Sequence, residues 1–326
     1  MIALVIASAI AAAIALFGTG SLARILAGRG TNQPILQQNA ANAVVPPHQH
    51  KSGTPTMGGL AIVGAALAGY LISHVRAGVV FSDQTLVVIA GILAMGTLGL
   101  VDDMTKVRVR QNRGIYWKAK GALSYLLALG IAAVLVVTTD IDTRVSLTRA
   151  DLPGWELGAV RWVVWAGTII FATANAVNVT DGLDGLAAGS ALLGFGAFAG
   201  IAFWALRNPT IYGDVVNPYD LAVLAAAFAG ACAGFLWWNA SPARIFMGDV
   251  GAFALGPALA LLALTTNTHL LLLLICGINL IEAGSVGLQM GVFRASGRRR
   301  RLFRLSPIHH HFEIVGWPET TVIVRF

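Results

Sequence analysis

The chain has 326 residues, of which 56% are hydrophobic and 11% are charged, and its formal net charge is +7. An ordinary soluble domain carries roughly 25% charged residues. A soluble globular fold is therefore excluded, because it could not bury this much apolar surface. The two cysteines lie within apolar stretches and give no sign of a disulfide framework.

Apolar segments long enough to cross a hydrocarbon core of about 30 Å recur along the chain. We expect each to be helical, because lipid forces backbone groups to pair within the segment. The nine predicted spans are residues 2–17, 57–75, 85–101, 119–138, 159–177, 185–204, 220–238, 251–266 and 269–292. Residues 320–326 resemble the start of a tenth. The predicted fold is all-α, a polytopic transmembrane bundle of nine to ten spans that forms one domain over residues 1–326.

Basic residues are distributed unevenly between alternate loops. One set of loops carries sixteen Lys and Arg residues and the opposite set carries five. By the positive-inside rule the richer side is cytoplasmic and the N-terminus is outside. The predicted cytoplasmic loops are residues 18–56, 102–118, 178–184, 239–250 and 293–319. This topology explains the net charge without nucleic acid, and the basic loops can attract anionic membrane lipids.

Acidic residues separate in the same way. Those in the external loops are expected to be solvated; they are Asp83, Asp140, Asp142, Asp151, Glu156, Asp214 and Asp220. The others lie near cytoplasmic membrane ends, several of them within apolar sequence, where an ionised carboxylate costs about 3 kcal/mol unless something binds it. The cytoplasmic acids are therefore the candidates for a functional site.

The first candidate motif is the pair Asp102 and Asp103, followed by Lys106, at the cytoplasmic end of the third predicted span. Adjacent residues on a helix point about 100° apart, so the two carboxylates do not belong to one stripe. Paired carboxylates beside a lysine suit Mg²⁺, a phosphate handled through Mg²⁺, or a proton acceptor. The alternative is an interfacial stop signal with ordinary salt bridges.

The second motif is the sequence NVTDGLDG, which contains Asn178, Asp181 and Asp184. The two aspartates are three residues apart and share a helix face if the sixth helix begins here. The glycines permit close approach of the backbone to a ligand. Helix capping is the alternative, but it accounts for one polar residue and not for four.

The third motif, FMGDVG, brings Phe246 and Asp249 to the start of the eighth predicted span. A helix dipole favours an acid at this position, so Asp249 alone is weak evidence for a functional site. It becomes a candidate because it shares the cytoplasmic face with the other acids. Phe246 is interpreted either as a stacking partner for a nucleobase or as a membrane-edge anchor.

The fourth motif is the run His309, His310 and His311 within SPIHHHFE. Three consecutive histidines cannot converge on one metal from a regular helix, and Zn²⁺ prefers spaced ligands. The run is therefore interpreted as a phosphate contact or as a means of orienting a neighbouring carboxylate.

Two further features are candidate ligand contacts. Lys51 and Thr56 belong to a Gly-rich, hydroxyl-bearing loop that suits phosphate or base contacts but lacks P-loop spacing. In the ninth predicted span, Glu282 and Gln289 are seven residues apart and share a helix face with Ser285. They are either packing contacts between helices or ligand contacts.

Five motifs follow one another in order: GTPTMGG (53–59), the Asp102–Asp103 pair, NVTDGLDGLA (178–187), FMGDVG (246–251) and SPIHHHFE (306–313). Together they resemble the polyprenyl-phosphate N-acetylhexosamine-1-phosphate transferase superfamily, and the first and last resemble its phospho-N-acetylmuramoyl-pentapeptide-transferase family. The resemblance implies Mg²⁺-dependent transfer of phospho-MurNAc-pentapeptide from UDP-MurNAc-pentapeptide to undecaprenyl phosphate, giving lipid I and UMP. It places this chemistry on the cytoplasmic face of the bacterial inner membrane.

The resemblance also implies a role for each motif residue. Asp249 would bind Mg²⁺, while Asp102 and Asp103 would serve the metal or the lipid phosphate, one of them as a base. His309 would assist at the phosphates. The implied substrate contacts are Lys51, Thr56, Asn178, Asp181, Phe246 and Gln289 on the nucleotide side, Lys106 and Lys120 at phosphate, and His310 and His311 beside His309.

The chain departs from the family pattern in residues 32–48, where a charged segment is expected, and in the tenth span, which is only begun. Two other functions fit parts of this pattern. One is a transferase of the same superfamily that moves GlcNAc-1-phosphate, and the other is a proton-coupled transporter. A transporter predicts acids and broken helices near the bilayer midplane, together with internal repeats, whereas these motifs lie at span ends. A homodimer is compatible with the sequence.

Overall fold

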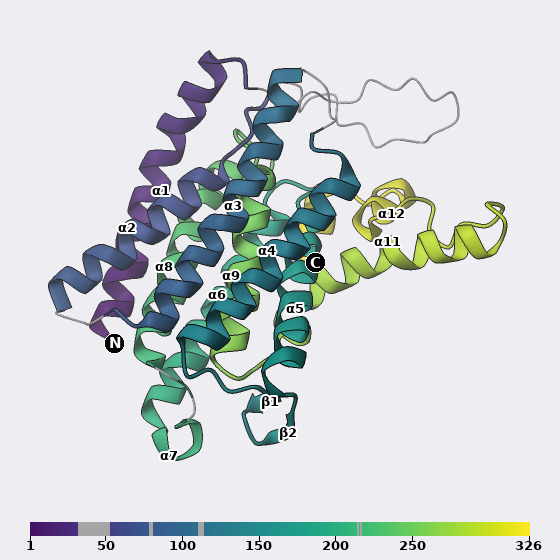
Figure 1. Cartoon of the computed structure of the whole chain (residues 1–326). Helices are drawn as coiled ribbons and strands as arrows, with labels where there is room; N and C mark the ends of the chain where they lie inside the picture. The colour runs from purple at the N-terminus through teal and green to yellow at the C-terminus, as the bar shows by residue number, and fades with distance from the viewer. Residues whose placement is uncertain (32–52, 78–80, 110–113, 214, 216) are drawn as a thin grey trace.

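The computed structural model describes residues 1–31, 53–77, 81–109, 114–213, 215 and 217–326. Figure 1 shows a bundle of long helices with a small hairpin at one end. The elements are α1 (Ile2–Gly28), α2 (Gly59–Ala77), α3 (Asp83–Val109), α4 (Trp117–Thr138), β1 (Arg144–Arg149), β2 (Leu152–Glu156), α5 (Gly158–Thr180), α6 (Leu186–Arg207), α7 (Pro209–Tyr212), α8 (Pro218–Asn239), α9 (Gly248–Thr265), α10 (Leu272–Ile275), α11 (Gly277–Ala295), α12 (Ile308–Val315) and α13 (Glu319–Arg325).

The membrane-spanning character of the bundle is confirmed. Within the described residues, seven helices are long and apolar enough to cross a membrane, namely α1, α3, α4, α5, α6, α8 and α9. The apolar part of α2, Gly59–Val75, is shorter. The chain is thus an all-α polytopic membrane protein, as its sequence predicts.

Helix α9 forms the centre of the bundle. Its residues from Val250 to Thr265 are all buried, and it packs against α3, α5 and α2. Because Asp249 lies in its first turn, the central helix carries that carboxylate to the end of the bundle where α3 finishes and α4 begins. The core therefore determines where the acidic motifs meet.

The ninth predicted span, residues 269–292, is not one continuous helix. It is divided at Cys276 into α10 and α11, next to Gly277, which has low helix propensity. Figure 1 shows α11 leaving the bundle sideways. The buried residues of α11 are all polar: Asn279, Glu282, Ser285 and Gln289. The side chains that this helix buries against the rest of the protein are therefore its polar ones.

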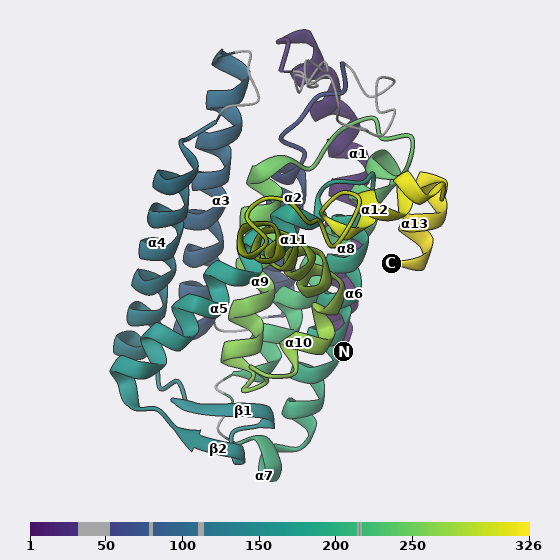
Figure 2. The ribbon, with the colours of Figure 1, turned by 90° about the vertical axis from the view of Figure 1, so that its right-hand side faces the viewer.

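A β-hairpin interrupts the predicted external loop between the fourth and fifth spans. Strands β1 and β2 are antiparallel, with Arg144 opposite Glu156, and the Leu270 amide donates a hydrogen bond to the Ser146 carbonyl. Figure 2 shows the hairpin across one end of the bundle. Only a loop was predicted here from the sequence, because strands of 6 and 5 residues are too short to stand out between two long apolar spans.

The prediction that Asp220 is solvated was wrong. Its side chain is 2% exposed. One carboxylate oxygen accepts a hydrogen bond from the Tyr70 hydroxyl (2.7 Å) and lies 2.8 Å from His74 Nε2. The other accepts bonds from the amide and the hydroxyl of Ser82, at 2.9 and 2.8 Å. These contacts join α8, α2 and the residue before α3, so Asp220 stabilises the helix ends instead of facing water.

Candidate active site

Three carboxylates meet where α3 ends and α9 begins. Oxygen atoms of Asp102, Asp103 and Asp249 lie within 4.8 Å of one another. The helices can approach because Gly99 faces the α9 backbone, where a Cβ atom would lie 2.2 Å from the Asp249 carbonyl oxygen. Gly248 adopts a left-handed φ of 74°, which glycine tolerates best. A Cβ there would lie 2.6 Å from an Asp103 oxygen.

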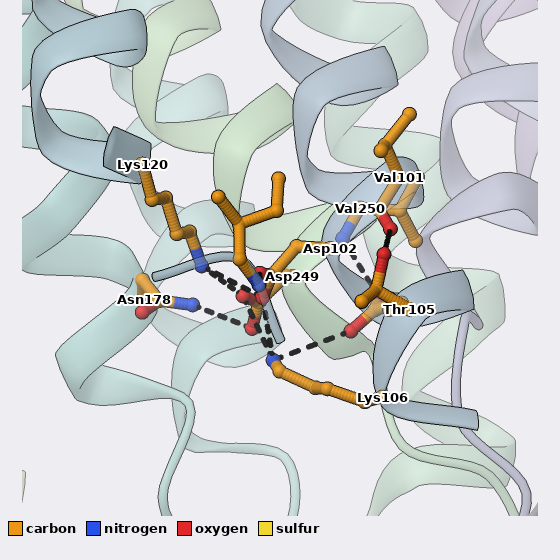
Figure 3. Close-up of polar contacts among 10 residues, drawn as sticks. Val101, Asp102, Thr105, Lys106, Lys120, Asn178, Asp249 and Val250 are labelled. Carbon is orange, nitrogen blue, oxygen red and sulfur yellow. Dashed lines mark hydrogen bonds and ion pairs between the residues drawn. The ribbon is translucent and has the colours of Figure 1, made fainter. Parts of the chain in front are cut away.

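Two lysines lie between the carboxylates (Figure 3). Lys106 Nζ is 2.9 Å from Asp102 Oδ2 and 2.9 Å from Asp249 Oδ2. Lys120, from the first turn of α4, contacts the same two oxygens, at 3.1 Å for Asp102. Three elements thus supply one charged cluster, and the lysines offset most of the repulsion between the acids.

The remaining carboxylate oxygens have neutral donors. Asn178, near the end of α5, donates from Nδ2 to Asp249 Oδ1 at 2.9 Å. The Ile115 amide donates to Asp102 Oδ1 at 2.7 Å, and the Val250 amide donates to Asp103 Oδ2 at 3.0 Å. These bonds hold each carboxylate in its observed orientation.

Asp181 lies beside this cluster, in the loop that follows α5. Burial, and after it the negative charges of Asp249 and Asp103, raise the pKa of its carboxyl to about 8, although the Gly248 amide hydrogen bond opposes this shift. Below that pH the carboxyl is mainly protonated and can donate a hydrogen bond. Asp184 instead accepts a hydrogen bond from the Ala243 amide at 2.9 Å, which ties the same loop to the one before α9.

The three histidines contact three different groups. His309 is fully buried, with Nδ1 2.9 Å from Glu282 Oε2. His310 Nδ1 lies 2.6 Å from Glu313 Oε2, and His311 Nδ1 accepts the Arg304 amide at 3.1 Å. This divergence agrees with the helical geometry of the run, and His309 has the carboxylate neighbour that the sequence interpretation offered.

The His309–Glu282 pair lies directly under the loop that carries Asp181. A Cβ atom on Gly182 would be 2.5 Å from His309 Nε2. Among the described residues, neither Nε2 of His309 nor Oε1 of Glu282 has a hydrogen-bond partner. Glu282 is thus a component that the sequence left undecided between packing and ligand binding. Its signal was its place on the polar face of α11.

The predicted nucleotide-side residues lie around the same loops. Thr56 is buried, and its hydroxyl would be 2.7 Å from a Cβ on Gly248. The Phe246 amide donates to the Pro55 carbonyl at 2.8 Å, and its carbonyl accepts from Gly58 at 2.9 Å. The GTPTMGG and FMGDVG motifs are therefore paired through their backbones.

Gln289 and Lys51 are the two other residues predicted on the nucleotide side. The Gln289 side chain holds the loop after α11: Oε1 accepts the amides of Leu302 and Phe303, and Nε2 donates to the Phe303 carbonyl. Because all three hydrogen bonds are to backbone groups of that loop, Gln289 holds the loop in place. Lys51 lies outside the described residues.

The close approach of α3 and α9 predicts a packing effect. We expect Gly99→Ala to lower the thermal midpoint of the purified protein by several degrees, because overpacking costs about 1–3 kcal/mol and the obstructing atoms are backbone. The matched control is Gly64→Ala on α2, where a Cβ meets no atom within 4 Å. Equal midpoints for both variants would contradict the packing described for α3 and α9.

Family models of known proteins match two parts of the chain. Residues 85–267 match the model described as Glycosyl transferase family 4. Residues 51–63 match the phospho-N-acetylmuramoyl-pentapeptide-transferase signature 1. The first match includes the three clustered carboxylates and both lysines, and the second includes the whole GTPTMGG motif.

Curated relatives resemble the chain over nearly its whole length. A phospho-N-acetylmuramoyl-pentapeptide-transferase of Frankia alni is 41% identical, over 98% of this chain and 92% of the relative. Proteins of the same name from Rhodococcus opacus and Streptomyces avermitilis are 44% and 41% identical, over 98% and 96% of this chain and 91% and 90% of the relatives. Likeness on this scale extends far beyond the motifs.

Proposed function

The chain belongs to the phospho-N-acetylmuramoyl-pentapeptide-transferase family, and from that premise we propose that it transfers phospho-MurNAc-pentapeptide from UDP-MurNAc-pentapeptide to undecaprenyl phosphate. The products are lipid I and UMP. The observation that supports this assignment most strongly is the cluster of three carboxylates and two lysines at one end of the bundle. The protein is an enzyme of the glycosyl-phosphate transferase class.

The reaction replaces one phosphoanhydride bond with another. An oxygen of the lipid phosphate attacks the phosphorus next to the sugar, and the bond to the uridine-bearing phosphate breaks, so that UMP leaves with the electron pair. Catalysis of such a transfer consists mainly of positioning and of charge stabilisation on the phosphate oxygens. Lys106 and Lys120 would supply that charge, and the bundle end would bring a lipid-borne and a soluble substrate together.

The donor set fits Mg²⁺. Carboxylate oxygens are its preferred protein ligands, usually one or two of them with water and substrate phosphates. Two ligands on opposite sides of Mg²⁺ lie at most about 4.2 Å apart, so oxygens within 4.8 Å need only a small side-chain adjustment. Bound there, Mg²⁺ would neutralise developing charge on the phosphates. Asp249 would hold it together with Asp102 or Asp103, and the remaining aspartate would face the lipid phosphate as ligand or base.

We assign the surrounding loops to the nucleotide. Asn178 would keep Asp249 oriented, and the protonated carboxyl of Asp181 would donate to the uridine or ribose. Phe246 and Thr56, which belong to the two paired motifs, would contact the nucleotide beside them. His309, which Glu282 holds in place, would assist at the phosphates next to the loop that carries Asp181. Lys51, beside the signature loop, is proposed as a further phosphate contact.

We place the active site on the cytoplasmic face of the bacterial inner membrane. The loops at that end hold most of the basic residues, which the positive-inside rule assigns to the cytoplasm. Lys120 and Asp249 lie in the first turns of α4 and α9, and Asp102 lies near the end of α3. This placement at helix ends favours an interfacial transferase over a transporter, whose carboxylates would lie near the midplane.

The donor test separates this function from GlcNAc-1-phosphate transfer. Purified protein with undecaprenyl phosphate is offered UDP-MurNAc-pentapeptide or UDP-GlcNAc, and UMP release is measured with Mg²⁺, then with excess chelator. We expect release only with the muramoyl donor, its loss on chelation and its recovery when Mg²⁺ is restored. Release with UDP-GlcNAc alone would overturn the proposed donor, and undiminished release in chelator would overturn the metal.

A further inference from the structure

Five arginines lie in the loop between α11 and α12, and all five are exposed. They are Arg298 to Arg301 and Arg304. Within the part of the chain that the structure describes, no carboxylate forms an ion pair with any of them. A surface with this much unpaired positive charge attracts anionic groups, so the position of each arginine relative to the active site determines what it can bind.

The loop turns back as soon as α11 ends. Gly297 and Arg298 adopt left-handed φ angles of 63° and 66°, which reverse the chain. The side chain of Gln289 then holds the backbone of residues 302–303 against α11. Figure 1 shows the chain returning from the tip of α11 toward the bundle, where α12 begins. The later arginines of the loop therefore lie between α11 and the run of three histidines.

Arg301 lies on the side of α11 that faces the protein. Its guanidinium carbon is 5.9 Å from the ring centre of Phe293. Successive residues on a helix turn by about 100°, so Phe293 lies within about 40° of the direction of Gln289, on the buried polar face. Leu280 and Leu288, which are 49% and 59% exposed, lie about 140° away from Phe293 by the same rule. Arg301 is thus held on the side of the active site and not on the side that is open to lipid.

Arg304 connects the same loop to the histidines. Its amide donates a hydrogen bond to His311 Nδ1 at 3.1 Å, and its Nη1 donates to the Ile314 carbonyl at 3.5 Å. His309, which is proposed above to assist at the phosphates, lies in the first turn of the same helix, α12. Arg301 is three residues from Arg304, at most about 11 Å of extended chain. Two positive charges therefore border the phosphate end of the site.

The proposed donor carries a matching negative charge. A muramoyl group is an acyl group, so it is joined to the amino end of the pentapeptide, and the peptide keeps its terminal carboxylate. Five extended residues span about 17 Å, so the carboxylate can reach a loop that begins beside the histidines. UDP-GlcNAc has no carboxylate. The planar guanidinium group of arginine suits a carboxylate, because it can donate two parallel hydrogen bonds.

We propose that Arg301 and Arg304 bind the carboxylates of the donor's pentapeptide and thereby select the muramoyl-peptide donor. The proposal rests on the transfer from UDP-MurNAc-pentapeptide proposed above. Arg301 is already held over an aromatic ring and Arg304 over the end of α12, so less conformational freedom is lost when the peptide binds. Both arginines would act on donor binding and not on the transfer step.

The test removes the charge from the protein and from the donor in turn. Arg301→Gln, Arg304→Gln and the control Arg299→Gln are purified in neutral detergent without anionic lipid. Arg299 belongs to the same exposed run, and the described residues give its side chain no hydrogen-bond or ring partner. The donor's Kd is measured by calorimetry, and kcat and KM are measured from UMP release. Both use UDP-MurNAc-pentapeptide and the same donor with its peptide carboxyl groups converted to amides.

We expect Arg301→Gln and Arg304→Gln each to raise the Kd and KM of the intact donor about tenfold, the effect of losing one hydrogen bond between charged groups. Their kcat should stay within about twofold of wild type. The amidated donor should bind wild type at least about tenfold more weakly, and the two variants should bind it as wild type does, because the pair is already broken. Arg299→Gln should match wild type with both donors.

Four results would overturn the proposal. Equal losses with the intact and the amidated donor would show that the arginines do not act on the peptide's carboxylates. A raised KM for undecaprenyl phosphate alone would assign them to the lipid phosphate. A loss in Arg299→Gln as large as that in Arg301→Gln would reduce the effect to general loop charge. Unchanged constants in detergent, with a loss only in vesicles that contain phosphatidylglycerol, would assign them to lipid headgroups.

Failure of the transfer itself would look different. A wild-type protein that releases no UMP with undecaprenyl phosphate would reject the proposed function, whereas the calorimetry with intact and amidated donors would still test the role of the arginines. Wild-type release of UMP, combined with an unchanged donor Kd in Arg301→Gln and Arg304→Gln, would retain the function and reject the peptide contact.

Discussion

Asp249→Asn is expected to lower kcat for UMP release on the order of 10³-fold, equivalent to about 4 kcal/mol of activation free energy. The substitution keeps the shape of the side chain but removes the charge that Lys106 and Lys120 share. A neutral amide is a weak ligand for Mg²⁺ beside two carboxylates, so the concentration of Mg²⁺ needed for half-maximal rate should also rise. Both effects are measured in one titration of rate against Mg²⁺.

The control for this variant is Asp83→Asn. Asp83 is also an acid in the first turn of a helix, at the start of α3, but its side chain is exposed and lies at the other end of that helix from the cluster. Its kcat should equal that of wild type. Wild-type turnover in Asp249→Asn, with the thermal midpoint unchanged, would remove Asp249 from the site.

Lys120→Met is expected to lower kcat/KM for the donor on the order of 10²-fold, about 2.7 kcal/mol. Lys120 joins Asp102 to Asp249 and lies 4.5 Å from the ring centre of Phe253. Methionine can keep the apolar contact while the charge is lost. Because a competing cation is removed from the acids, the concentration of Mg²⁺ for half-maximal rate should fall, in the direction opposite to that of Asp249→Asn.

The neighbouring Lys118 provides the matched control. It is exposed, with Nζ 5.4 Å from the ring centre of Trp117 and away from the carboxylates. Lys118→Met should keep both kinetic constants within twofold of wild type. A loss in Lys118→Met as large as that in Lys120→Met would show that positive charge at the start of α4 in general, and not the bridge between Asp102 and Asp249, determines the rate.

The candidate site could be predicted from the sequence largely because each part lies in a short motif at the end of an apolar segment. Asp102, Asn178 and Asp249 were each placed at one membrane face by the alternation of spans, and the structure brings them together. The close approach of these elements could not be predicted, since the need for glycine at positions 99 and 248 depends on the atoms that face them in the folded chain.

Other features depend on contacts between residues far apart in the chain. Asp220 was expected to be solvated. Its hydrogen-bond partners lie 138 to 150 residues earlier in the chain, and no local sequence pattern predicts such contacts. The division of the ninth predicted span at Cys276 also depends on tertiary context, because the polar face of α11 is satisfied only when His309 and the loop at Phe303 pack against it.

The most direct test of the proposed site is to locate a divalent ion. Crystals of the protein grown with Mn²⁺ in place of Mg²⁺ would be measured for anomalous scattering from the metal. The proposed site predicts one strong peak within ligand distance, about 2.2 Å, of an Asp249 oxygen and of at least one of Asp102 and Asp103, and no such peak in Asp249→Asn. A fully occupied peak elsewhere, with none between these three carboxylates, would contradict it.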